Sequence, residues 1–260
     1  MKALLKYPGG KWRIATWIIS HFPPHKVYCE PFFGSGAVFF LKPPARIETI
    51  NDMDGNVVNL FRVCRENPEK LARAVELTPW SREEFVSCVD LDISDPIERA
   101  RRTLVRYHQS FGACNHSKFS WRNVQVASGP PCSKQWNRLP SEVAEICKRL
   151  KEVQIENIDA LELIKRYDNP DTLLYLDPPY PLALREKNMY KHEMTDSQHE
   201  KLLGAIIESK SKVMISSYDN DLYNDMLKNW YVSEKHTIAQ KGLPRTEKIY
   251  MNYQPPLLAL

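Results

Sequence analysis

The chain has 260 residues, of which 43% are hydrophobic and 26% charged, enough apolar content for one large domain or a domain with an insertion. No apolar run reaches the roughly 20 residues that cross a bilayer, and we expect no signal peptide because the N-terminus lacks a long apolar segment. Six cysteines are scattered without a C-x-x-C pair. We therefore expect reduced thiols in a cytoplasmic protein, with no membrane partner and no metal.

Short apolar runs alternate with helical patterns along most of the chain. We expect strands at 26–30, 46–52, 153–157, 172–177, 212–217, 231–238 and 247–253. Helical spacing predicts helices at 54–75, 81–88, about 95–109 and 219–229, and a further helix after the capping box of Thr195 and Gln198. This alternation predicts an α/β fold with a mostly parallel sheet. No helix separates the last two strands, so an antiparallel hairpin closes the sheet.

The alternation of strand and helix patterns stops in residues 78–150. The segment from 97 to 151 holds eleven Lys or Arg against three acids, a charge of +8, while the whole chain carries +4 and the remainder therefore −4. Such a basic segment indicates a polyanionic partner or a solvated helical face. We expect residues 1–77 and 151–260 to form one domain, and 78–150 an inserted recognition domain containing a long loop or hairpin.

A glycine-rich turn follows the first predicted strand, in "CEPFFGSGAVFF" at 29–40. Phe32, Gly34 and Gly36 lie where a strand gives way to a helix, so the backbone can approach a ligand there. A plain tight turn is the alternative. Asp52 ends the next predicted strand, at the position where an acid binds ribose hydroxyls in nucleoside-binding α/β folds. Its alternative is a helix N-cap.

Two further segments carry candidate ligand-binding groups. In "KYPGGK" at 6–11, Lys6, Tyr7 and Lys11 surround a Pro-Gly-Gly turn and could bind a carboxylate or phosphate, or form only a mobile turn. In "LLYLDPPY" at 173–180, a buried strand ends in two prolines without N–H groups. Asp177 and nearby carbonyls thus offer acceptors and Tyr180 a flat ring. This pattern favours a planar group that donates two hydrogens, such as the exocyclic amine of a nucleobase.

The order "KYPGGK", "EPFFGSG", "NDMD", basic insertion, "DPPY", "RTEKIYMNY" resembles the Dam-like (D12-class, alpha-group) DNA adenine-N6 methyltransferases. The resemblance covers about 1–65 and 150–253. It implies a Rossmann-like class I methyltransferase sheet with a mostly helical target-recognition region. It also implies S-adenosyl-L-methionine as the cofactor and, as the acceptor, an adenine flipped out of double-stranded DNA.

The resemblance assigns roles to individual residues. It implies cofactor binding by Tyr7, Lys11, Phe32, Gly34, Gly36, Asp52, Asp159 and Asp177. It implies catalysis by Asp177, Pro178 and Tyr180, and DNA contact by Lys6. The family usually has an aromatic residue after the acid that corresponds to Asp159, whereas this chain has Ala160.

The insertion does not align with known recognition domains, so its DNA-binding candidates come from residue type alone. They are Lys118, Trp121, Arg122, Asn123 and Arg138. Tyr107, Phe119 or Trp121 could fill the gap left by a flipped base, with a core position as the alternative.

Alternative functions use the same residues. An N4-cytosine or RNA methyltransferase has similar chemistry, but such enzymes more often carry serine or asparagine in place of Asp177. A catalytically inactive DNA-binding module predicts altered motifs, and these are intact. We expect a monomer, or a weak dimer on DNA, in a bacterial or phage-infected cell. The target sequence, and pairing with a restriction enzyme, do not follow from the motifs.

Overall fold

The computed structural model describes residues 2–111, 120–123, 132–184, 190–238 and 244–257. Two compact units share these residues. A helical unit contains Met1–Trp12, Gly34–Leu41 and Asp54–Ile155, and a sheet unit contains Arg13–Phe33, Lys42–Met53 and Glu156–Leu260. Among the described helices, none combines the length and apolar character needed to cross a membrane.

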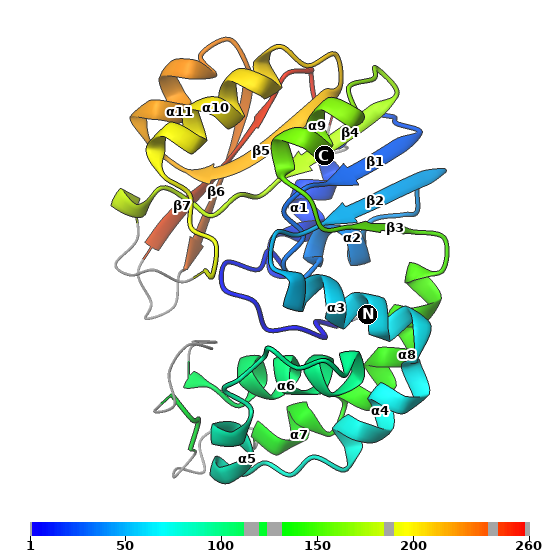
Figure 1. Cartoon of the computed structure of the whole chain (residues 1–260). Helices are drawn as coiled ribbons and strands as arrows, with labels where there is room; N and C mark the ends of the chain where they lie inside the picture. The colour runs from blue at the N-terminus through cyan, green and yellow to red at the C-terminus, as the bar shows by residue number, and fades with distance from the viewer. Residues whose placement is uncertain (1, 112–119, 124–131, 185–189, 239–243, 258–260) are drawn as a thin grey trace. The chain divides into compact units, whose positions relative to one another are not determined.

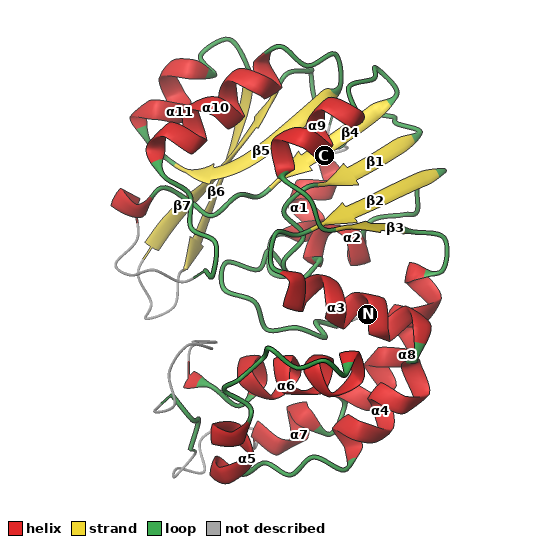
Figure 2. Cartoon of the chain, viewed as in Figure 1, coloured by secondary structure: helices red, strands yellow, loops and turns green. Residues whose placement is uncertain are grey.

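The sheet has seven strands in the order β3-β2-β1-β4-β5-β7-β6 (Figures 1 and 2). They are β1 (Val27–Glu30), β2 (Ile47–Asn51), β3 (Gln154–Glu156), β4 (Thr172–Leu176), β5 (Lys212–Tyr218), β6 (Tyr231–Ile238) and β7 (Pro244–Met251). β1 pairs in parallel with β2 and β4, and β4 with β5, whereas β7 is antiparallel to both β5 and β6. The predicted α/β class and the antiparallel hairpin are therefore confirmed.

Strand order reverses between β1 and β4, which makes this point the topological switch of the sheet. In open α/β sheets, ligands bind outside the carboxyl ends of the strands at such a switch. β1 ends at Glu30 and β4 ends immediately before Asp177. The fold thus brings the start of the glycine-rich turn and the DPPY segment to neighbouring strand ends.

Each face of the sheet has its own covering. α9 (Ala160–Arg166), α10 (Asp196–Ile207) and α11 (Asp221–Met226) pack on one face, where Leu174, Leu176 and Ile215 are fully buried. Phe22, which follows α1 (Ala15–Ser20), lies 5.9 and 6.0 Å from the rings of Tyr28 and Tyr175 on the other face. Side chains alternate along a strand, so 175 and 177 share this second face. A short 3-10 helix, Leu182–Leu184, follows the DPPY segment.

The described part of the helical unit contains seven α-helices. They are α2 (Ala37–Leu41), α3 (Gly55–Glu66), α4 (Pro68–Glu76), α5 (Arg82–Ser87), α6 (Pro96–His108), α7 (Cys132–Trp136) and α8 (Leu139–Leu150). The single helix predicted at 54–75 is wrong. Asn67 leaves helical geometry, with φ −140° and ψ 52°, because Pro68 disfavours the α conformation at the residue before it.

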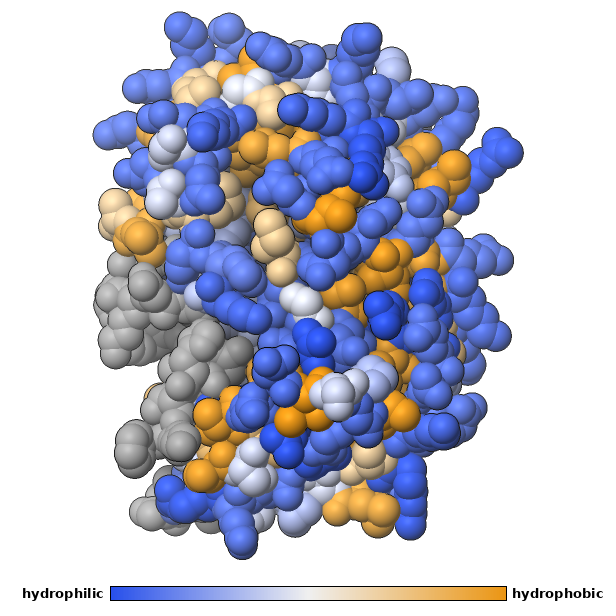
Figure 3. Space-filling view, in the orientation of Figure 1, coloured by the Kyte–Doolittle hydropathy of each residue, from blue (hydrophilic) through white to orange (hydrophobic). Residues whose placement is uncertain are grey.

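Apolar side chains supply the interior and polar ones most of the surface. Hydrophilic residues dominate the face drawn in Figure 3, with small hydrophobic patches between them. Cys29, Cys64, Cys88 and Cys147 are free thiols. Burial raises the pKa of Cys88 to about 11, so this thiol stays protonated and inert. The described residues contain no group of three His, Cys, Asp or Glu side chains able to hold a metal ion.

Candidate active site

Polar side chains gather on one face of the sheet, at the carboxyl ends of the parallel strands and on β7 beside them. We call this set the strand-end cluster. It consists of Tyr28, Glu30, Tyr175, Asp177, Tyr180, Ser216, Tyr218 and Glu247. All eight lie in the sheet unit. Only Asp177 and Tyr180 of this cluster were singled out from the sequence.

Asp177 is anchored by β5. Ser216 Oγ donates to Asp177 Oδ1 over 2.8 Å and lies 3.4 Å from the hydroxyl of Tyr175. The hydrogen bond fixes the carboxylate on the face of the sheet that carries the cluster. Pro178 is buried beside it and, like Pro179, has no N–H group to donate. The segment therefore presents acceptors, the chemistry expected from its sequence.

Tyr180 is buried, and its hydroxyl donates to Glu247 Oε2 over 2.7 Å. Its ring meets the Tyr218 ring edge-on, with the centroids 4.7 Å apart and an interplanar angle of 71°. Burial and the neighbouring carboxylate hold the pKa of the Tyr180 hydroxyl well above its ordinary value. Tyr180 is therefore a neutral aromatic surface whose hydroxyl already has a partner.

Glu30 is a buried carboxyl at the end of β1. Burial, reinforced by the charge of Asp177, raises its pKa to about 8, although the hydrogen bond from the Tyr28 hydroxyl (2.7 Å) acts in the opposite direction. Beside it, Lys42 forms a buried ion pair with Glu48, and the Lys42 ammonium lies 4.2 Å from the centre of the Tyr28 ring. Proton occupancy of Glu30 therefore changes near neutral pH.

Asn51, the last residue of β2, ties together the ends of three strands. Its buried amide donates to the carbonyls of Pro31 (2.9 Å) and Ile158 (3.1 Å), and its oxygen accepts from the Ile158 N–H (2.9 Å). Asp52 follows directly, and its own carbonyl accepts from Asn157 (2.7 Å). The backbone that carries Asp52 is thus fixed by two asparagines.

Asp52 and Asp159, two of the three acids that the resemblance assigns to the cofactor, differ in local role. The N-cap of α3 is Asp54, whose side chain accepts from the N–H of Asn56, so Asp52 does not have the capping role considered as its alternative. Asp159 is exposed and does cap a helix, because its Oδ1 accepts from Leu161 (2.8 Å) and Glu162 (3.3 Å) at the start of α9. Phe32 is half-buried against the core beneath α9–α11.

In the helical unit, the glycine turn packs on the N-terminal loop. Gly34 and Gly36 have φ values of 50° and 65°, in the left-handed region that favours glycine. A Cβ on Gly34 would lie 2.9 Å from the Tyr7 ring, and that ring lies 5.5 Å from Tyr107. The buried Lys11 donates to the Gly9 carbonyl over 3.0 Å. Tyr7, Lys11, Gly34 and Gly36 are therefore brought together.

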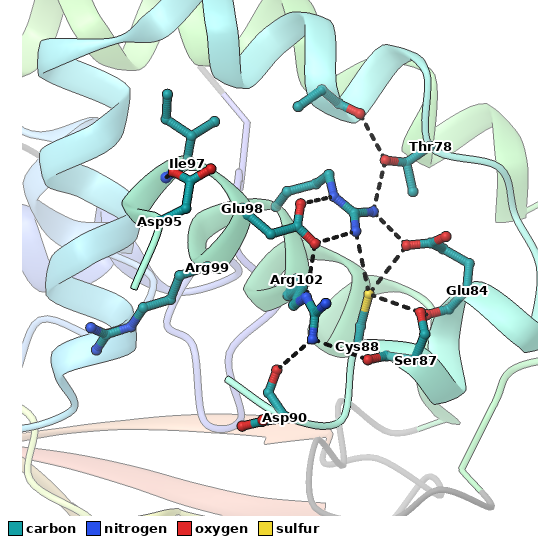
Figure 4. A network of polar contacts seen from close by, with 12 residues as sticks. Thr78, Glu84, Ser87, Cys88, Asp90, Asp95, Ile97, Glu98, Arg99 and Arg102 are labelled. Atoms are coloured by element: carbon teal, nitrogen blue, oxygen red, sulfur yellow. Dashed lines mark hydrogen bonds and ion pairs between the residues drawn. The ribbon is translucent and has the colours of Figure 1, made fainter. Parts of the chain in front are cut away.

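Several arginines of α6 form hydrogen bonds and ion pairs with other residues of the helical unit (Figure 4). Arg101 donates to Glu98 (2.7 Å), to Glu84 (2.5 Å) and to Thr78 (3.0 Å), and Arg102 also donates to Glu98 (2.8 Å). These arginines lower the pKa of Glu98 to about 2. Three more arginines bond within the unit, namely Arg99 to Asn56, Arg106 to Phe85 and Arg149 to Phe39. These five arginines are engaged in packing the unit.

The candidates for DNA contact and for filling the gap left by a flipped base differ in their surroundings. Arg138 and Asn123 are exposed and Lys6 is half-buried, whereas Lys118 and Phe119 lie outside the described residues. Trp121 forms a β-bridge with Ser110, and the guanidinium of Arg82 lies 4.6 Å from the centre of its ring. The Arg122 N–H donates to the Gln109 carbonyl. Tyr107 is buried, in agreement with the core alternative for that residue.

Comparison with known proteins matches residues 7–243 to the D12 class N6 adenine-specific DNA methyltransferases. The chain is 25% identical over 294 residues to the type II methyltransferase M.MjaIII of Methanocaldococcus jannaschii, covering 97% of this chain and 99% of that protein. It is 22% identical over 281 residues to the DNA adenine methylase of Salmonella typhi (98% and 96% covered). It is 25% identical over 270 residues to that of Vibrio cholerae (95% and 93% covered).

These matches extend over nearly the whole chain and confirm the resemblance inferred from its motifs. The family is one of enzymes that carry a methyl group from a donor to adenine in DNA. The chain belongs to the D12 class N6 adenine-specific DNA methyltransferase family.

Proposed function

We propose that this protein transfers the methyl group of S-adenosylmethionine to N6 of an adenine flipped out of double-stranded DNA at a specific sequence. The observation that carries the proposal is the position of Asp177. Its carboxylate lies at the carboxyl end of β4, beside the switch point of the sheet, and is oriented by the Ser216 hydroxyl over 2.8 Å. An acceptor group at that place suits the amine of a nucleobase.

The residues of the DPPY segment have complementary tasks. Asp177 and the Pro178 carbonyl accept the two N6 hydrogens, which draws the nitrogen lone pair out of conjugation with the ring. A carboxylate has lone pairs for this donor as well as for Ser216. Tyr180 stacks on the extruded base and so offsets part of the few kcal/mol that flipping costs. The remaining requirement is to hold the nitrogen at roughly 3 Å from its reaction partner and in line with it.

When bound, S-adenosylmethionine supplies an electrophilic methyl group. The residues proposed to hold it are Tyr7, Lys11, Phe32, Gly34, Gly36, Asp52, Asp159 and Asp177. Two observations support the fit. Gly34 keeps its turn free of a side chain beside the Tyr7 ring, and Asp52 stands at the end of the β2 strand, the position suited to ribose hydroxyls.

Residues 78–150 are proposed as the target-recognition domain. Five arginines and Lys148, six of the eleven basic side chains between 97 and 151, bond within the helical unit, so the contacts to DNA phosphates would come from the other five. Candidates for DNA contact remain Lys6, Lys118, Trp121, Arg122, Asn123 and Arg138. A double-stranded DNA substrate is consistent with a cytoplasmic location, and a monomeric state stays a prediction.

Replacing Asp177 tests the proposed function. We expect Asp177→Ala to lower transfer of labelled methyl groups to DNA by about 100-fold or more, because the amine loses its acceptor, while S-adenosylmethionine binding measured by calorimetry falls less. Asp171→Ala is the matched control. That acid precedes the opposite end of β4 and pairs with Lys26 at the surface. Full activity of Asp177→Ala would contradict the proposal.

A further inference from the structure

The strand-end cluster contains a buried carboxylate to which the sequence motifs assign no role. Glu247 belongs to β7, within the segment "RTEKIYMNY", and only 8% of its surface is exposed. Its Oε2 accepts the Tyr180 hydroxyl over 2.7 Å. Burying a carboxylate costs free energy unless the group is hydrogen-bonded. Glu247 is buried and has such a bond, so it differs from an acid exposed at the surface.

The register of β7 against β5 sets this contact. Glu247 lies directly opposite Tyr218 in the antiparallel β5–β7 pair, and directly opposite residues of such a pair project to the same face. Arg245, two residues earlier on β7, has its guanidinium 5.6 Å from the centre of the Tyr218 ring. The β5–β7 pair thus places an acid, an aromatic ring and a cation beside the DPPY segment.

Two contacts fix the plane of the Tyr180 ring. Glu247 holds the hydroxyl, and the ring packs against Tyr218 in a T-shaped contact with the centroids 4.7 Å apart and an interplanar angle of 71°. Pro178 and Pro179 restrict the backbone just before it. Without the bond to Glu247, the Tyr180 side chain would rotate more freely about its χ1 and χ2 torsions.

We propose that Glu247 is a positioning residue for methyl transfer, which orients the Tyr180 ring so that its face is ready to stack on the flipped adenine. The inference rests on the stacking role proposed for Tyr180. Its physical basis is preorganisation: a ring already in the productive orientation avoids an ordering cost when the base arrives. Glu247 acts through Tyr180 and takes no proton from the substrate.

Glu247→Leu and Tyr180→Phe remove the same hydrogen bond from its two ends. We expect each to lower the single-turnover methyl-transfer rate about 10- to 100-fold, with the Kd for S-adenosylmethionine unchanged within about twofold. The double variant should be no slower than the slower single variant, because one bond is lost in all three. Glu247→Gln keeps an acceptor oxygen and should restore most of the rate.

A spectroscopic measurement reports on the stacking step itself. Once the methylated sequence is known, 2-aminopurine at the target adenine should fluoresce less intensely in complex with Glu247→Leu than with the unaltered protein, since less of the base is flipped out. Glu234→Leu is the control. Glu234 is an acid of the neighbouring β6 strand, 48% exposed and paired with Lys248, and its loss should change neither the rate nor the fluorescence.

Three results would overturn the inference: an unchanged rate in Glu247→Leu, an unchanged rate in Tyr180→Phe, or losses that multiply in the double variant. If Glu247→Leu does not fold, Tyr180→Phe still reports on the bond with the carboxylate intact. Tyr180→Ala separates this inference from the proposed function. Full activity of Tyr180→Ala removes the stacking role, whereas an inactive Tyr180→Ala with a fully active Glu247→Leu removes only the role of Glu247.

Discussion

Gly34 shows how one residue type can be required by both conformation and space. Its φ of 50° is strained for any side chain, and a Cβ there would lie 2.9 Å from Cδ1 of Tyr7. Gly204 is helical, on α10, and a Cβ added to it would meet no atom within 4 Å. We therefore expect replacement by alanine to change the stability of the protein in opposite directions at the two positions.

Gly34→Ala should destabilise the protein by about 1–2 kcal/mol and weaken S-adenosylmethionine binding, because the turn must move away from Tyr7. Gly204→Ala should raise stability by about 0.5–1 kcal/mol, because alanine loses less backbone entropy in a helix. Denaturant unfolding and calorimetric binding measure both effects. Equal shifts in the two variants would show that the left-handed turn has no special requirement.

Glu30 predicts a pH dependence of stability. Its pKa rises from an ordinary 4.5 to about 8 in the folded protein, so between these values the folded state holds a proton that the unfolded chain releases. The stabilisation is complete below about pH 4.5 and is lost as the pH rises through about 8. Glu30→Gln mimics the protonated form, so its melting temperature should fall less between pH 5 and 9. Parallel curves for the two proteins would contradict the assignment.

At the scale of elements, α6 is held to α5 by the charges around Glu98. Glu98 accepts from Arg101 at 2.7 Å and from Arg102 at 2.8 Å, and Arg101 also reaches Glu84 on α5. The Arg73–Glu76 pair on α4 has a similar distance of 2.7 Å, but its side chains are 64% and 59% exposed. Glu98 and Glu76 therefore differ mainly in how strongly water screens their charges.

Glu98→Gln should lower the free energy of unfolding by about 2 kcal/mol, because two arginines lose charged acceptors in a partly buried site. Glu76→Gln should cost less than about 0.5 kcal/mol, as exposed ion pairs do. Urea unfolding measures the difference. A similar loss in both variants would show that the α5–α6 network contributes no more than a surface pair.

The strands were predictable from sequence because each is short and contains β-branched or aromatic residues, and every predicted strand overlaps an observed one. Helices were less predictable. Spacing alone did not reveal the break at Asn67, which Pro68 imposes. α8 was missed within a polar segment, although Leu139, Val143, Ile146 and Leu150 recur at helical spacing and are all buried.

The residues of the candidate site were also only partly predictable from the sequence. Asp177 and Tyr180 could be singled out because they are adjacent in a rigid segment of unusual composition. Ser216 and Glu247 contact them at 2.8 and 2.7 Å from positions 39 and 67 residues away in sequence. Those contacts depend on strand order and on the register of β5 against β7, which no local pattern specifies. The sequence did contain one signal for a further site residue, because Glu30 is an acid at the end of a predicted strand.

At the scale of the whole molecule, the charge count overstated the surface available to DNA. The segment 97–151 carries +8, yet five of its arginines hold the helical unit together. DNA recognition would therefore depend on fewer cations than the composition implies. The function itself rests on the ordered set of motifs and on family membership across residues 7–243.

The most direct test is to express the protein in cells that lack endogenous adenine methylation and to sequence their DNA for modified bases. The unaltered protein should produce N6-methyladenine at one short sequence, and Asp177→Ala, expressed to the same level, should produce none. Unmodified adenine in the presence of folded, unaltered protein, or N4-methylcytosine in its place, would contradict the account.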